Sequence, residues 1–136
     1  MVMKEINKET IYDLPVHDSD FLGIHISQND HGVTDLSLDV IFCKDELEKL
    51  SDYSDFISTE GYTTFAFIGC DWIAVDIFCN RIQRDSIDFI DFKQDTPELK
   101  KYSAQDRAIH VVIFFTSGTK IECIAQNATL KSYNKY

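Results

Sequence analysis

Alternation of apolar and polar side chains predicts that most of this chain is β-structure. Between residues 34 and 43, apolar side chains occupy the even positions from 36 to 42, while Asp or Ser occupies positions 35, 37 and 39. This period of two predicts a strand with one buried and one exposed face. The same reasoning predicts strands in six further segments: 21–28, 62–68, 72–79, 86–93, 108–116 and 119–126.

Turn-forming residues between these segments predict how the strands pair. The sequence Asn29-Asp30-His31-Gly32 predicts a hairpin between segments 21–28 and 34–43. Gly69-Cys70-Asp71 predicts a second hairpin between segments 62–68 and 72–79. Segment 108–116 is the most apolar, and we expect it to be a central strand that is buried on both faces.

Two segments depart from the β-pattern and predict short helices. The three-to-four spacing of Leu47, Leu50 and Tyr53 or Ser54 favours a helix within 44–55. Thr96-Pro97-Glu98 is typical of a helix start, with the helix reaching about Ala104. We therefore expect an α+β fold, with a mainly antiparallel, twisted or half-closed sheet of about seven strands and one or two short helices. Residues 1–136 are expected to form a single domain with flexible ends at 1–10 and 128–136.

Acidic side chains dominate the first part of the chain. The formal net charge is −10, and residues 11–43 carry six Asp and no Lys or Arg. Residues 51–80 carry five more acidic residues, again without Lys or Arg. Carboxylates without nearby bases create a negative potential, which disfavours nucleic acid and anionic membranes and favours a basic protein or a cation.

Several classes of site lack their sequence signatures. There is no glycine-rich phosphate loop or calcium-binding loop, and the four cysteines form no C-x-x-C pair, so we expect neither a cofactor nor a metal. The first residues have no signal-peptide core, and no apolar run approaches the roughly 18 residues of a membrane-spanning helix. The cysteines are therefore expected to be reduced thiols in a cytoplasmic protein.

His17 and Asp18 are the strongest candidates for chemistry. Adjacent His and Asp residues bind metals in phosphohydrolases, so a small metal-dependent hydrolase centred on His17 and Asp18, with His110, is the alternative hypothesis. It requires the three side chains to meet in one cleft. The structural explanation is that Asp18 or Ser19 caps the turn before a strand while His17 bonds to backbone. Cys70 is the best-placed thiol, but the adjacent Asp71 carboxylate should raise its pKa.

The pattern favours a partner-binding surface over an active site, and we assign no catalytic residue. Our leading hypothesis is a non-enzymatic acidic binding protein that engages a basic protein partner. The expected contacts combine carboxylates with aromatic rings: Asp35, Asp39, Tyr53, Asp71, Trp72 and Asp76. A homodimer formed through exposed strand edges is a further alternative.

Two stretches carry a resemblance to known proteins. LPVHDSDFLGIHI, followed by a hairpin and then by FAFIGCDWIAVDIF, resembles small uncharacterised bacterial β-rich proteins. Some of these families are assigned as immunity proteins of bacterial toxin systems. The resemblance covers about half of the chain and transfers no functional residue. It implies an acidic, non-catalytic protein that binds a basic toxin domain.

Overall fold

The computed structural model describes residues 2–43, 61–78, 85–103 and 107–133 of the 136-residue chain. Within these residues, nine strands form one antiparallel sheet in the order β1-β9-β4-β3-β2-β6-β7-β8-β5. The strands are β1 (Val2–Ile6), β2 (Ser19–Gln28), β3 (Thr34–Ile41), β4 (Tyr62–Ile68), β5 (Trp72–Asp76), β6 (Ser86–Lys93), β7 (Ile109–Phe115), β8 (Lys120–Ala125) and β9 (Asn127–Tyr133). A 3₁₀ helix, η1 (Ile11–Asp13), and an α-helix, α2 (Pro97–Tyr102), complete the described elements.

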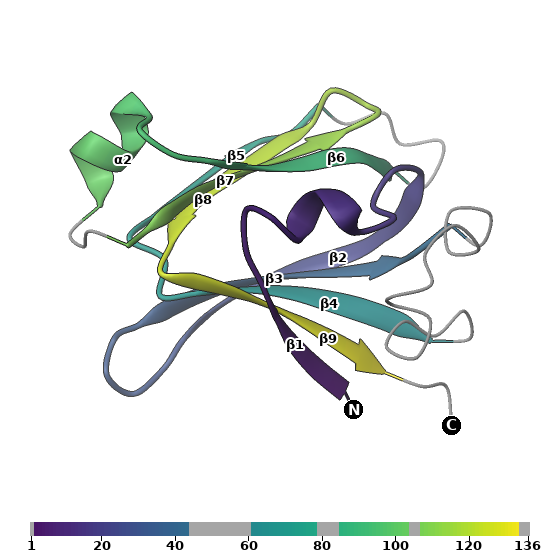
Figure 1. The fold of residues 1–136 in the computed structure, drawn as a ribbon, viewed down its shortest axis with the longest axis horizontal. Helices are drawn as coiled ribbons and strands as arrows, with labels where there is room; N and C mark the ends of the chain where they lie inside the picture. Colours follow the sequence, from purple (N-terminus) through teal and green to yellow (C-terminus); the bar gives the residue numbers. More distant parts are fainter. Residues whose placement is uncertain (1, 44–60, 79–84, 104–106, 134–136) are drawn as a thin grey trace.

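The sheet folds into two layers that enclose the core (Figure 1). β1, β9, β4, β3 and β2 form layer A, and β6, β7, β8 and β5 form layer B. The layers are joined where β2 pairs with β6 over only two residue pairs, Ser19↔Ile87 and Asp20↔Ser86. Burial of the apolar faces between the layers supplies the main driving force for folding. Large side chains that are fully buried there include Phe65, Phe67, Leu38, Val111 and Ile113.

The connection from β1 to β2 runs along β6 and covers part of its edge. Ile11 and Leu14 of this connection are buried in the core. The Tyr12 hydroxyl donates a hydrogen bond to the Asp91 carboxylate. The Asp18 N–H donates to the Ile87 carbonyl at 2.9 Å. β2 pairs with only two residues of β6, so the rest of that edge would otherwise expose its backbone groups. These contacts cover part of that edge.

The structure confirms a β-rich antiparallel fold but has nine strands instead of about seven. The two additional strands lie at the chain ends, where β1 pairs with β9 in a register that places Met3 opposite Lys131. Residues 2–6 and 127–133, which overlap the ends that were expected to be flexible, thus form strands, while flexibility at 1–10 and 128–136 stays a prediction. Ile6 and Leu130 face the core, while their polar neighbours face outward. The many polar residues in these segments led to the expectation that they were flexible.

β4 and β5 do not form the expected hairpin. β4 pairs with β3 and β9 in layer A, whereas β5 pairs with β8 in layer B. The chain crosses between the layers at Gly69, whose φ of +67° suits glycine. The Gly69 N–H donates to Asp35 Oδ1 at 3.0 Å, and the Cys70 N–H donates to the Thr34 carbonyl at 2.7 Å. The first hairpin, β2–β3, is confirmed.

The other local predictions agree with the structure where it describes them. α2 begins as predicted, because the Thr96 hydroxyl accepts a hydrogen bond from the Leu99 N–H and Pro97 occupies the first turn. The helix ends at Tyr102, two residues earlier than expected. β7 is the predicted central strand, with Val111 and Val112 buried on its opposite faces. The predicted helix within 44–55 lies outside the described residues.

Candidate functional site

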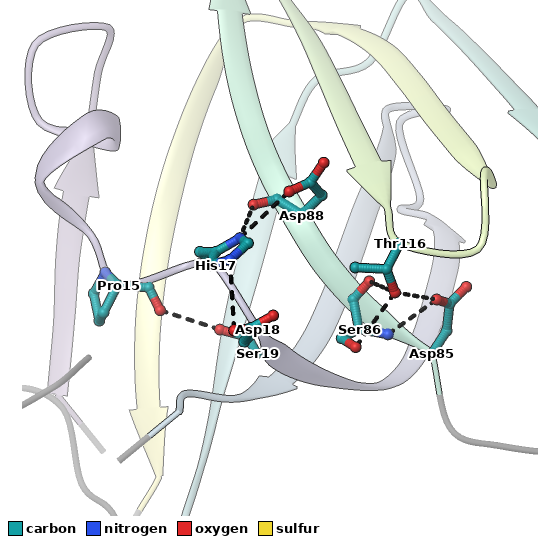
Figure 2. Close-up of polar contacts among 8 residues, drawn as sticks. All are labelled: Pro15, His17, Asp18, Ser19, Asp85, Ser86, Asp88 and Thr116. Carbon is teal, nitrogen blue, oxygen red and sulfur yellow. Dashed lines mark hydrogen bonds and ion pairs between the residues drawn. The ribbon is translucent and has the colours of Figure 1, made fainter. Parts of the chain in front are cut away.

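The turn before β2 places His17 at the joint between the layers. Asp18 adopts a φ of 62°, which turns the chain just before Ser19 begins β2 opposite Ile87. The His17 imidazole lies between two carboxylates: Nε2 is 3.5 Å from Asp18 Oδ2, and Nδ1 is 3.3 Å from Asp88 Oδ1 (Figure 2). Nδ1 is also 3.1 Å from the backbone carbonyl of Asp88. As expected from sequence, His17 therefore bonds to backbone at a turn.

A second polar group lies at the same end of β6. The Asp85 carboxylate accepts hydrogen bonds from the Ser86 N–H at 2.9 Å and from the Ser117 hydroxyl at 2.5 Å. The Thr116 hydroxyl lies 3.4 Å from this carboxylate and 3.4 Å from the Ser86 hydroxyl (Figure 2). These hydrogen bonds tie the turn between β7 and β8 to the start of β6.

At the joint, the carboxylates are exposed to solvent, whereas the nearest serine hydroxyl is not. The Ser19 hydroxyl is fully buried and donates to the Pro15 carbonyl at 3.2 Å, so a substrate in solvent has no access to it. The His17 side chain is 57% exposed, and those of Asp18 and Asp88 are 59% and 47% exposed. We call His17, Asp18, Asp85 and Asp88 the joint cluster.

His110 occupies a different, buried environment in layer B, where it is 3% exposed. Its Nδ1 lies 3.0 Å from Thr96 Oγ1, and its Nε2 lies 3.2 Å from Glu122 Oε1. Because the Thr96 hydroxyl accepts from the Leu99 N–H, a neutral ring is satisfied when Thr96 donates to Nδ1 and Nε2–H donates to Glu122. His110 thus fastens the start of α2 to β7 and β8.

The structure does not bring His17 and His110 into one cleft. His17 contacts Asp88 near the start of β6, whereas His110 pairs in register with Lys93 at its end. These two points on β6 lie about 16 Å apart at the rise of a strand. Among the residues that the structure describes, no group of three or more His, Cys, Asp or Glu side chains could hold a metal ion. The hydrolase hypothesis therefore gains no support from the geometry.

Asp35 and Asp39 lie on the outer face of β3, as the alternation predicted, but both serve the fold. Asp35 accepts the Gly69 N–H at the crossover between the layers. Asp39 accepts a hydrogen bond of 2.6 Å from the Thr64 hydroxyl and lies 3.3 Å from His25 Nε2. The Asp39 side chain is only 21% exposed, which limits what it can offer to a partner.

The other expected contact residues belong to layer B. Trp72 and Asp76 are the first and last residues of β5, and Asp71 immediately precedes that strand. The Trp72 ring stacks on Tyr102 at 4.8 Å with an interplanar angle of 1°, so α2 covers one of its faces. Asp71 and Asp76 are exposed. The expected set is thus divided between the two layers, and Tyr53 lies outside the described residues.

Cys70 and Cys123 form a thiol pair that the sequence analysis missed. A hydrogen bond from the Cys123 thiol lowers the pKa of Cys70, although burial and the Asp35 and Asp71 carboxylates act in the opposite direction. The same hydrogen bond, together with burial, raises the pKa of Cys123 well above its usual value. Asp71 therefore acts as predicted, but the neighbouring thiol outweighs it. The sequence could not reveal the pair, because its members lie in separate segments.

The joint cluster also contains carboxylates that the sequence analysis did not select. Asp85 and Asp88 lie outside the two acid-rich segments, 11–43 and 51–80, and reach the joint because β6 pairs with the start of β2. Ion pairs within the described residues join carboxylates to His17, His25 and His110, and join Glu122 to Lys120. The histidines of these pairs offset the carboxylates only when their rings are protonated.

The helices that the structure describes include none that is long and apolar enough to cross a membrane. Comparison with protein-family models, with curated protein sequences and with solved structures finds no match for this chain.

Proposed function

We propose that this chain is a non-enzymatic, cytoplasmic binding protein that engages a basic protein partner through its carboxylates. The observation that carries the proposal is the set of exposed carboxylates in the joint cluster, where the only cationic partner that Asp18 and Asp88 share among the described residues is the imidazole of His17. An imidazole offsets a carboxylate only while it is protonated, whereas Lys or Arg would do so at every physiological pH. While the imidazole rings are neutral, the negative potential implied by a net charge of −10 is available to a partner.

The hydrogen-bond partners of the histidines favour a binding function over a catalytic one. His17 is held between two carboxylates, and His110 is held between Thr96 and Glu122. General acid–base catalysis needs a base within reach of both a substrate and a nucleophile. The Ser19 hydroxyl, which is the closest in sequence to His17, is buried and bonded to backbone.

The proposed partner surface is centred on Asp71, Trp72 and Asp76, with the joint cluster adding to the negative field. Asp71 and Asp76 are exposed, whereas Asp35 and Asp39 are partly buried and bonded within the fold. In this proposal Asp35 stabilises the crossover at Gly69, and Asp39 stabilises the pairing of β3 with β4. A bacterial immunity protein that neutralises a basic toxin domain, as the sequence resemblance implies, would have these properties.

Capture of the partner at two salt concentrations tests this proposal. The immobilised protein is exposed to lysate of its native host in about 50 mM salt and is then washed with about 500 mM salt, where the Debye length falls several-fold. We expect a protein with a basic isoelectric point to be retained in the first condition and released in the second. Retention of an acidic protein, or retention that does not depend on salt, would contradict the proposal.

A further inference from the structure

The sheet has two terminal strands, β1 and β5. Among the described residues, β1 pairs with β9 alone and β5 pairs with β8 alone. Each terminal strand has a row of N–H and C=O groups directed away from its neighbour, and such a row can pair with a strand from another chain. The two edges differ in their side chains, and this difference indicates which one is suited to a partner.

β1 contains a lysine, which protects an edge strand, and β5 contains none. Lys4 lies within β1 beside Glu5, and a lysine on an edge discourages strand addition. Residues 71–78, which contain β5, include no Lys, Arg or Pro. Large apolar side chains are also exposed there: Val75 at 43%, Ile77 at 69% and Phe78 at 64%. The β5 edge therefore offers both backbone groups and apolar contact area.

Charge identifies the kind of strand that fits this edge. Asp71 and Asp76 are exposed at the two ends of β5, so an added strand would have a carboxylate near each of its ends. Cross-strand pairs of opposite charge stabilise a sheet. We propose that the β5 edge binds an extended, basic segment of the partner protein, which adds a strand beside β5. This inference rests on the proposed function and specifies where the partner binds.

The same charges disfavour a second copy of this chain as the occupant. Two β5 strands paired edge to edge would bring together two copies each of Asp71 and Asp76 on one short ribbon. Directly opposed like charges destabilise strand pairing. A segment with Lys or Arg next to β-branched residues avoids this repulsion and can still contact Val75 and Ile77.

A synthetic peptide of alternating Lys and Val, labelled with a fluorophore, is the probe that tests the inference. Binding is measured by fluorescence anisotropy at about 50 mM salt, where surface charges are weakly screened. A second peptide has the same sequence but carries an N-methyl group on every backbone nitrogen, which removes the N–H donors from both of its edges without changing charge. We expect the first peptide to bind, the methylated peptide to lose binding, and the amides of residues 72–76 to gain protection from hydrogen exchange.

Matched variants separate local charge from net charge. D71N/D76N should weaken peptide binding about five- to tenfold, as expected for the loss of two exposed charge pairs. E9Q/D13N changes the net charge equally at exposed positions in the connection from β1 to β2, whose helix η1 contacts β6 at the opposite margin of layer B, and should cause a smaller loss. Equal losses in the two variants, or equal binding of the two peptides, would overturn the inference. Thermal unfolding of both variants checks that they are folded.

Two further outcomes would also overturn it. Sedimentation equilibrium that shows a dimer, together with protection of the amides of residues 72–76 from hydrogen exchange in the absence of any peptide, would assign the edge to a second copy. A salt-dependent basic partner that leaves residues 72–76 unprotected in hydrogen exchange would refute the β5 site while leaving the proposed function intact. Failure of the proposed function itself is recognised separately, because no salt-dependent basic partner would be captured.

Discussion

Asp39 illustrates how a residue that resembles surface charge in the sequence can contribute to the fold. Alternation along β3 correctly places it on the face that points away from the core. It cannot show that the hydroxyl of Thr64, the register partner of Asp39 on β4, lies 2.6 Å away, or that His25 approaches from β2. The direction of a side chain follows from local periodicity, whereas its partners depend on which strands become neighbours.

Removal of the Asp39 carboxylate should therefore destabilise the fold. We expect D39A to lower the free energy of unfolding by about 1–2 kcal/mol, because the Thr64 hydroxyl loses its acceptor at a partly buried position. D30A, in the exposed turn between β2 and β3, should change it by less than about 0.5 kcal/mol. Urea unfolding of both variants provides the comparison. Equal stability of D39A and D30A would show that the Asp39 hydrogen bond contributes little.

Tyr12 gives a prediction that depends on pH. Its hydrogen bond to the Asp91 carboxylate, aided by burial, raises the pKa of Tyr12 above the usual 10.0. A raised pKa in the folded state stabilises the protein below pH 10, and this contribution is lost as the pH rises through the folded-state pKa. Because Tyr12 is 60% exposed and solvent weakens the hydrogen bond, Y12F should be less stable than wild type at pH 7 by only about 0.5 kcal/mol.

The difference between Y12F and wild type should shrink as the pH rises above 10, and urea unfolding across this range measures it. Y102F is the matched control, since it keeps the ring that stacks on Trp72 and should differ little from wild type at any pH. A Y12F defect that stays constant through pH 11 would contradict the role assigned to the Tyr12–Asp91 hydrogen bond.

At the scale of elements, the sequence predicted most strands and misjudged how some of them are arranged. Segments 62–68 and 86–93 match β4 and β6 in full, because alternation and β-branched content are local signals. The β4–β5 hairpin was wrong because a Gly-containing turn is equally compatible with a crossover between layers. β1 and β9 were missed because each becomes a strand by pairing with a segment far away in the chain.

The crossover at Gly69 can be tested with a graded series of Gly-to-Ala variants. Gly23 has open space around it and no left-handed φ, Gly32 has open space but a φ of +79°, and Gly69 combines a φ of +67° with close contacts. A Cβ at Gly69 would lie 2.9 Å from Gln126 Cδ, so the Gln126 side chain would have to shift.

We expect G23A to be nearly neutral and G32A to cost about 1–2 kcal/mol of stability, the usual penalty for a left-handed Ala. G69A should cost more than G32A, since the displacement of Gln126 adds to the backbone strain. Combining G69A with Q126A should reduce the cost to about that of G32A. Thermal or urea unfolding ranks the series, and a G69A variant as stable as G23A would contradict this description of the crossover.

At the scale of the whole molecule, the uneven charge was visible in the sequence but its arrangement was not. The acid-rich segments correctly indicated Asp71 and Asp76 as exposed carboxylates near β5. The sequence indicated only His17 and Asp18 of the joint cluster, because Asp18 and Asp88 are 70 residues apart and reach the same imidazole only through the pairing of β2 with β6. Electrostatic surfaces are properties of the folded chain, so composition predicts their sign better than their location.

The rate of association with the captured basic partner, measured as a function of salt, tests the central claim most directly. Complementary charge accelerates association at low salt, and the acceleration is lost as salt screens it. We predict that the association rate constant falls at least tenfold between about 20 and 500 mM salt while the dissociation rate changes much less. An association rate that stays constant over this range would contradict an acidic binding surface as the function of this protein.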